Sequence, residues 1–293
     1  MRRYWTILAL LLAAIIWSLP GCSAPGTSYP YDDTPAPVPL TGRLKVHFID
    51  VGQGDAILIQ TPAGKNMLVD AGDNIYGDKV ISYLESQGVD ELEVVVGTHT
   101  HSDHIGGLDM VIDHFPVYSV YLPDVTQNTK SFRDVLTAVQ KKGLRITTAR
   151  AGITVPLEGI ECQLLAPVKE YYAELNDYSV VLRLAYGGRA FLLTADVGTE
   201  PENDILASGA NLKATVLKVG HHGSYASSST RFLNAVGARY GVIMLGQGND
   251  YGYPHDSALQ RLSKAGLQLY RTDLNGTIIF STDGQDLEVT TER

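Results

Sequence analysis

The sequence predicts an α/β (α+β) protein in which two mixed sheets pack face to face and helices cover their outer faces. Each half of the chain begins with several short strand-like runs and then alternates between strand-like and helix-like segments. No linker-like composition appears after Gly42, so we expect one folded domain rather than two. Two packed sheets flanked by helices are the most economical way to bury the apolar faces of all these segments.

In the first half of the folded part, strands are predicted by apolar alternation and helices by apolar residues at helical spacing. The run RLKVHFIDV alternates like a strand, and a glycine turn separates it from DAILIQT. The expected strands are residues 43–51, 55–61, 66–72, 92–97 and 117–123, and the expected helices are residues 78–88, 106–115 and 131–143.

The second half has the same layout, although no sequence repeat supports a duplication. The apolar runs are again short, and glycines close most of the helical segments. The expected strands are residues 152–157, 160–167, 178–187, 190–196, 213–220 and 240–246, the expected helices are residues 202–209, 228–236 and 256–266, and residues 276–291 form a closing hairpin.

The N-terminus is typical of an export signal. Basic residues precede an apolar run that ends at Leu19 and is short for a membrane span. The following tetrad, LPGC, resembles the lipobox of bacterial lipoproteins, which implies that residues 1–22 are a lipoprotein-type signal peptide and that Cys22 carries lipid. We therefore expect an exported protein, lipid-anchored on the extracytoplasmic face of a bacterial membrane. Plain secretion and an uncleaved anchor are the alternatives.

Residues 23–42 contain five prolines, which predicts a semi-extended tether without a core. The folded domain is then expected at residues 43–293. Within it, Cys162 lies in a strand-like run and is expected to be buried rather than reactive. The net charge of −9 argues against a protein that coats nucleic acid, but it leaves room for a nuclease whose metal ions supply local positive charge.

The stretch THTHSDHIGG, residues 98–107, holds three of the eight histidines in the chain. His99 and His101 follow a predicted strand, where alternate residues can point the same way, and Asp103 and His104 occupy the turn that follows. Imidazole nitrogens and carboxylate oxygens suit zinc, manganese or iron, and the pattern offers two adjacent positions. Solvent-facing histidines without a ligand are the alternative, but the spacing and the aspartate favour a metal site.

The motifs THTHSDH, LVDAG, LLTAD and HHG resemble those of the metallo-β-lactamase superfamily of hydrolases. Longer motifs resemble, more specifically, the hydrolase domain of the ComEC competence (DNA-internalisation) proteins. These motifs are FIDVGQGDAILIQTPAGKNMLVDAG, LKVGHHGSYASSS and YGYPHDSALQRLSKAG, and the resemblance extends from Arg43 to the end of the chain. The superfamily implies a four-layer αββα sandwich with a two-metal site at one edge of the sheets.

The resemblance also implies roles for individual residues. The implied metal ligands are His99 and His101 for one ion, Asp103 and His104 for the other, Asp196 as the bridge and one histidine of the HHG pair. We favour His222 as that ligand and His221 as a phosphate contact or proton donor. Asp70 would orient a ligand histidine. A further histidine that many members carry is missing here, and Asn176, Asp177 or water is expected in its place.

Several other polar residues near these motifs have separate expected roles. His255 is expected at the rim of the site as a substrate or catalytic contact, and Lys218 as a phosphate contact. Ser224 could meet phosphate oxygens or, with the serines that follow it, cap the next helix. His47 and His114 are expected to be structural. For Asp50, Gln53 and Asp55, hydrogen bonds within the turn and support of the site are equally favoured.

These residues predict hydrolysis assisted by two divalent ions, zinc or manganese, that activate a hydroxide. Asp103 or Asp196 would align the hydroxide, and His221 or His255 would protonate the leaving group. The ComEC-like resemblance implies a phosphodiester substrate, with DNA favoured, and a separate DNA-uptake channel protein as a partner. The alternatives are an envelope hydrolase like the phosphorylcholine esterases, a metal-containing binding module without turnover and, as a weaker option, β-lactam hydrolysis.

Overall fold

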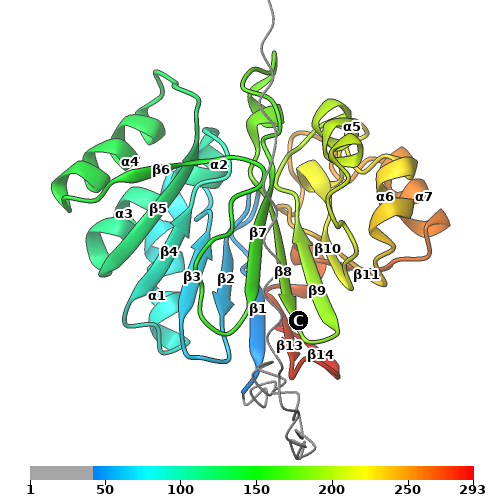
Figure 1. Cartoon of the computed structure of the whole chain (residues 1–293), viewed down its shortest axis with the longest axis horizontal. Coiled ribbons are helices and arrows are strands. Elements are labelled where there is room, and N and C mark those ends of the chain that lie inside the picture. The colour runs from blue at the N-terminus through cyan, green and yellow to red at the C-terminus, as the bar shows by residue number, and fades with distance from the viewer. Residues whose placement is uncertain (1–41) are drawn as a thin grey trace, which may run out of the picture. The chain divides into compact units, whose positions relative to one another are not determined.

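The computed structural model describes residues 42–293, and within them two sheets pack face to face between two layers of helices (Figure 1). This arrangement confirms the predicted fold class. The signal peptide expected at residues 1–22 and nearly all of the tether expected at residues 23–42 lie outside the described residues, so both remain predictions. Among the described residues, no helix combines the length and apolarity needed to cross a bilayer.

The first sheet has eight strands in the order β14-β13-β1-β2-β3-β4-β5-β6. Pairing is antiparallel from β14 to β3 and parallel from β3 to β6. The bounds are β1 Leu44–Phe48, β2 Ile57–Gln60, β3 Asn66–Val69, β4 Leu92–Val96, β5 Val117–Pro123, β6 Ile146–Ala149, β13 Ile278–Thr282 and β14 Leu287–Thr291.

The second sheet has six strands in the order β12-β11-β10-β9-β8-β7. Pairing is parallel from β12 to β9 and antiparallel from β9 to β7. The bounds are β7 Glu161–Ala166, β8 Val181–Tyr186, β9 Arg189–Leu193, β10 Val216–Lys218, β11 Tyr240–Ile243 and β12 Gln268–Arg271.

Helices α1, α3 and α4 cover the first sheet, and α5, α6 and α7 cover the second (Figure 1). Two of them begin at side-chain caps: Thr129 accepts the Phe132 N–H ahead of α4, and Ser229, one of the serines expected to cap this helix, accepts the Phe232 N–H ahead of α6. The bounds are α1 Gly77–Ser86, α2 Ser102–Ile105, α3 Leu108–His114, α4 Lys130–Lys141, α5 Thr199–Ser208, α6 Thr230–Val236, α7 Asp256–Lys264 and α8 Thr272–Asn275, with short 3₁₀ turns at Asn74–Tyr76, Leu175–Tyr178 and Gly220–Gly223.

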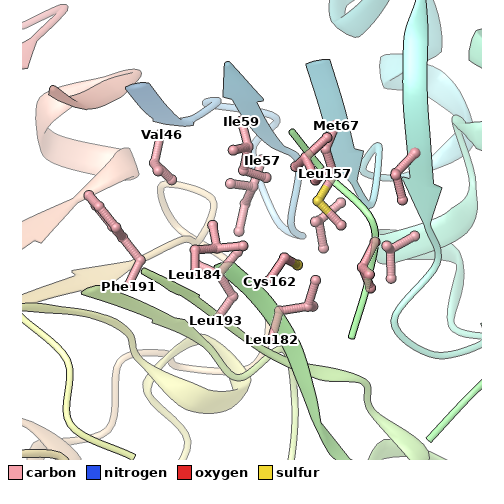
Figure 2. Packing of buried hydrophobic residues seen from close by; sticks show 14 of the residues in the cluster. Val46, Ile57, Ile59, Met67, Leu157, Cys162, Leu182, Leu184, Phe191 and Leu193 are labelled. Carbon is pink, nitrogen blue, oxygen red and sulfur yellow. The ribbon is translucent and has the colours of Figure 1, made fainter. Parts of the chain in front are cut away.

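The core between the sheets consists of the inward-facing residues of both. Figure 2 shows Val46, Ile57, Ile59 and Met67 of the first sheet opposite Leu182, Leu184, Phe191 and Leu193 of the second. Cys162 is buried among them, and this burial raises the pKa of its thiol to about 12. The expectation of an unreactive, buried Cys162 is therefore confirmed.

Two details of the predicted layout are wrong. Residues 152–157 do not form a strand, because only an isolated bridge joins Thr154 to Gln163. Two short strands, β6 and β12, escaped the pattern analysis; three of the four residues of β6 are exposed, so it lacks apolar alternation. The closing hairpin predicted at residues 276–291 is confirmed as β13 and β14, and it pairs with β1 in the first sheet.

Candidate metal centre

Loops at one edge of the two sheets bring the predicted residues together. The strand β4 leads into the histidine stretch, β9 leads to Asp196, and β10 leads to the HHG pair. In β9 and β10, Leu193 is paired in register with Lys218, so the segments that follow these parallel strands start side by side. Sites in α/β proteins commonly lie at the carboxyl ends of parallel strands for this reason.

Four side chains converge most closely at this edge: Asp103, His104, Asp196 and His222. Each offers one donor atom, and these four atoms all lie within 4.8 Å of one another. Asp196 Oδ2 lies 3.3 Å from both His104 Nε2 and His222 Nε2, and His222 Nε2 lies 3.4 Å from Asp103 Oδ2. Residues distant in the sequence therefore form one cluster, as the motif analysis predicted.

The donor atoms of this cluster fit a divalent cation. Among the described residues, His104 Nε2, His222 Nε2 and Asp196 Oδ1 are buried and have no hydrogen-bond partner. The 3.3 Å contacts to Asp196 Oδ2 are close, but their geometry is not that of a hydrogen bond. Buried polar atoms are almost always partnered, and imidazole nitrogen with carboxylate oxygen is a typical donor set for zinc or manganese.

Neighbouring groups orient both imidazoles. His104 Nδ1 lies 2.8 Å from Asp70 Oδ2, and Asp70 also accepts hydrogen bonds from the N–H and the hydroxyl of Thr98. His222 Nδ1 lies 2.7 Å from the carbonyl oxygen of Met244. Because a carboxylate or a carbonyl only accepts, Nδ1 of each imidazole donates, and Nε2 is the nitrogen that faces the cluster and can bind a cation. This supports Asp70 as an orienting residue and His222, rather than His221, as the ligand.

The cluster has the electrostatics of a cation site. Burial opposes protonation of His222, but the Asp196 and Asp103 carboxylates outweigh burial and raise the pKa of His222 to about 9. The same balance raises the pKa of His104 well above its usual range, with Asp196 the main opposing carboxylate. Without a metal, the carboxylates thus draw protons onto the imidazoles, and a bound cation would displace these protons.

The backbone is strained at this edge. Four non-glycine residues have a positive φ here: Asp70 (58°), Ala195 (42°), His221 (49°) and His222 (52°). Such a conformation costs about 1–3 kcal/mol each and persists where surrounding contacts enforce it. The His221 N–H donates to the carbonyl of Ala195, which ties the strained segments together.

Gly54 lets the first glycine turn pack against the histidine stretch. Its φ is +128°, and a side chain there would collide with the carbonyl oxygen of Asp103. The adjacent Asp55 N–H donates to this same carbonyl over 3.1 Å. The DVGQGD turn therefore supports the site by fixing the backbone of Asp103.

His99 and His101 lie beside the cluster as a separate pair. His99 Nε2 is 3.1 Å from His101 Nδ1, and the His99 and His104 ring centroids are 4.2 Å apart. Burial lowers the pKa of His99 well below its usual range, so its imidazole is neutral and able to act as a ligand. The second metal position at His99 and His101 remains a prediction.

A cavity of about 330 Å³ opens directly over the centre. Asn176 lines it and lies 3.4 Å from His221 Nε2, whereas Asp177 turns away and accepts the Gly198 N–H. Asn176 is therefore better placed than Asp177 for the missing histidine position. The cavity is lined by Gln53, His101, Ser102, Asp103, Asn176, Asp196, His221, His222, Tyr251 and Tyr253.

Two tyrosines of the cavity were not predicted from the sequence. Tyr253 Oη lies 3.1 Å from His221 Nε2, and Tyr251 lies beside Tyr253 at the rim. Both belong to the YGYPH segment, in which His255 was the residue predicted to lie at the rim of the site. His255 itself does not line the cavity; its Nδ1 accepts the Tyr225 N–H instead, so the structure does not favour a substrate contact there.

The predicted phosphate contact at Lys218 is wrong. Lys218 is fully buried, its ammonium lies 2.7 Å from Asp55 Oδ2, and it donates to the carbonyl of Ala195. The residue therefore supports the Asp55 side of the centre from within. Ser224 is also buried and outside the cavity, where its hydroxyl accepts the Ala226 N–H, and the helix cap is provided by Ser229.

The remaining histidines lie in other contacts. Burial lowers the pKa of His47 to about 4, and its Nδ1 lies 2.9 Å from Tyr83 Oη. His114 pairs with Glu85 at the surface. Neither belongs to the metal cluster, in agreement with the structural roles expected for both.

This fold, with its histidine and aspartate centre, defines a metallo-β-lactamase hydrolase, and the chain belongs to the metallo-beta-lactamase superfamily, which matches residues 49–247. It is similar to ComE operon protein 3 of Bacillus subtilis, at 30% identity over 82% of this chain and 33% of that protein. It is also similar to competence protein ComA of Neisseria gonorrhoeae, at 33% identity over 79% of this chain and 31% of that protein. The chain thus spans about a third of the length of these relatives.

Among solved structures, the chain resembles the metallo-beta-lactamase fold protein YhfI from Bacillus subtilis. The TM-score is 0.56 at 15% sequence identity, over 83% of this chain and all of that one. At this identity the likeness bears on the fold alone. The similarity to competence proteins confirms the ComEC-like resemblance found in the motifs.

Proposed function

We propose that the chain is a metal-dependent phosphodiesterase that cleaves DNA. The observation that carries this proposal is the convergence of Asp103, His104, Asp196 and His222, with unpartnered donor atoms, beneath an open cavity. The similarity to competence protein ComA and to ComE operon protein 3, together with the ComEC-like motifs, supports a phosphodiester over other bonds.

These four residues, together with His99 and His101, would hold two divalent cations, zinc or manganese. When bound, the cations would offset charge on the phosphodiester oxygens and acidify a water molecule. Asp196 Oδ2 lies 3.3 Å from His104 Nε2 and from His222 Nε2, so Asp196 would hold the cation of this cluster, and the superfamily resemblance implies that it also reaches the second one. Asp103, half-exposed at the cavity wall, would orient the attacking water.

His221 and Tyr253 would donate a proton to the leaving group. Burial lowers the pKa of His221, so its imidazole is neutral near pH 7, and burial raises the pKa of Tyr253, so its phenol keeps its proton. The contact of 3.1 Å between Tyr253 Oη and His221 Nε2 supports a proton held between these two groups at the cavity wall. There it can be delivered to a departing alkoxide.

The sequence supports two further parts of this proposal. The lipobox-like tetrad at Cys22 supports an exported protein held on the extracytoplasmic face of a bacterial membrane. The ComEC-like resemblance of the motifs supports a separate DNA-uptake channel protein as a partner.

A second candidate is a phosphorylcholine esterase-like hydrolase of the cell envelope. Tyr251 and Tyr253 line the cavity, and aromatic rings attract quaternary ammonium groups. A metal-containing binding module without turnover is the third possibility.

A comparison of substrates tests the proposal. With manganese or zinc added, the protein is expected to hydrolyse bis-p-nitrophenyl phosphate and single-stranded DNA, and EDTA is expected to abolish both activities. Turnover no higher than that of the Asp103→Ala variant would favour the binding module. Faster turnover of p-nitrophenyl phosphorylcholine than of DNA would favour the envelope hydrolase.

A further inference from the structure

The rim of the cavity carries an exposed aromatic surface that the hydrolytic centre does not use. Tyr251 lines the cavity and yet is 62% exposed. Its ring is stacked on that of Tyr253, with centroids 5.4 Å apart and an interplanar angle of 12°. Tyr253 in turn lies against His221, at 5.5 Å between ring centroids, so the aromatic surface is continuous with the centre.

The loop that carries these rings is fixed by its own hydrogen bonds. The Asn249 side chain donates to the carbonyls of Gly246 and Tyr253 and accepts the Tyr253 N–H. Gly252 has a φ of +72°, in the left-handed region, which folds the chain back so that residues 251 and 253 stack. The outer face of Tyr251 is thus held at the rim before any ligand arrives.

We propose that the outer face of Tyr251 is a stacking subsite for a nucleobase next to the scissile phosphate. The inference rests on the proposed phosphodiesterase function and extends it to the part of the substrate outside the centre. With a phosphate in the cavity, the base on the neighbouring sugar must leave through the rim, where Tyr251 lies. Stacking on tyrosine accepts any base, because every base offers a π-face.

The shape of this surface favours a base over a quaternary ammonium group. Aromatic cages surround such a cation with several rings. Tyr251 and Tyr253 are nearly parallel, and therefore they offer one flat face rather than a cage. A flat face suits a planar base that is free of its complementary strand, so the subsite selects single-stranded over paired DNA.

Three variants test the subsite: Tyr251→Ala, Tyr251→Phe and, as the matched control, Tyr118→Ala. Tyr118 is similarly exposed, at 61%, but lies at the start of β5, at the opposite end from the edge that carries the centre. Each variant is assayed on an oligothymidylate, on an abasic oligonucleotide of the same length, on bis-p-nitrophenyl phosphate and on p-nitrophenyl phosphorylcholine. Binding of fluorescently labelled oligothymidylate is measured in parallel by anisotropy.

Tyr251→Ala is expected to raise KM and the dissociation constant for oligothymidylate by about tenfold, the loss typical of one base stacked on an aromatic ring. The kcat on oligothymidylate and the rate on the abasic substrate should stay within about twofold of wild type, as should all values for Tyr251→Phe and Tyr118→Ala.

The subsite would be overturned if Tyr251→Ala lost as much activity on the abasic substrate as on oligothymidylate. It would also be overturned if Tyr251→Ala bound oligothymidylate as tightly as the wild-type protein. So would a larger loss on p-nitrophenyl phosphorylcholine than on DNA. If the wild-type protein binds oligothymidylate but hydrolyses none of the substrates, the proposed function fails, and the anisotropy comparison still decides the subsite.

Discussion

Replacement of Asp103 by alanine is expected to abolish metal-dependent hydrolysis and to lower the bound metal from about two ions per chain toward one. Asp103 Oδ2 lies 3.4 Å from His222 Nε2 and belongs to the cluster of four donors. Loss of even an outer hydrogen-bond partner of a metal ligand costs about 10–100-fold in affinity or activity, so loss of a ligand should exceed this. Elemental analysis measures the metal, and hydrolysis of bis-p-nitrophenyl phosphate measures the activity.

Asp256→Ala is the matched control, because Asp256 is an exposed carboxylate at the start of α7. It should retain both the metal and the activity of the wild-type protein. An Asp103→Ala variant with an unchanged metal content would refute the assignment of Asp103 as a ligand, even if its activity fell.

Replacement of Lys218 by methionine is expected to destabilise the fold by about 3–5 kcal/mol, because it leaves the buried carboxylate of Asp55 without its partner. Both side chains are almost fully buried, and the ammonium and Asp55 Oδ2 are 2.7 Å apart. Urea unfolding in EDTA measures the effect, since removal of metal separates the ion pair from the stabilisation that a bound cation would add.

The matched control is Lys169→Met. Lys169 also forms two ion pairs, with Glu200 and Asp204, but its side chain is 46% exposed, so its loss should destabilise the fold far less than the loss of Lys218. The double variant Asp55→Asn, Lys218→Met should recover part of the lost stability, because no buried charge is left unpaired. A Lys218→Met variant as stable as Lys169→Met would show that the buried pair is not needed.

Strong periodic patterns made much of the fold predictable. The run LEVVV is almost entirely apolar, because both faces of β4 are largely buried. The strand β4 could therefore be located by sequence alone. The edge strand β6 could not, because three of its four residues face solvent. The pairing of β13 with β1 depends on contacts across most of the chain, which local patterns do not record.

At the centre, spacing predicted the cluster but not the direction of every side chain. The HxHxDH pattern located Asp103 and His104 because residues so close together in sequence stay together in space. Lys218 precedes the HHG pair and was predicted to contact a phosphate. It is, however, the last residue of a strand that is buried on both faces. In the YGYPH segment, the turn at Gly252 decides that Tyr251 and Tyr253, and not His255, line the cavity.

We expect side chains from distant segments to hold a pair of divalent cations at the base of this cavity. Anomalous diffraction from crystals loaded with zinc tests it most directly. We expect two peaks about 3.5–4 Å apart, one of them within about 2.0–2.2 Å of His104 Nε2 and His222 Nε2, with Asp196 between the two. Peaks elsewhere, or none at these nitrogens, would contradict the claim.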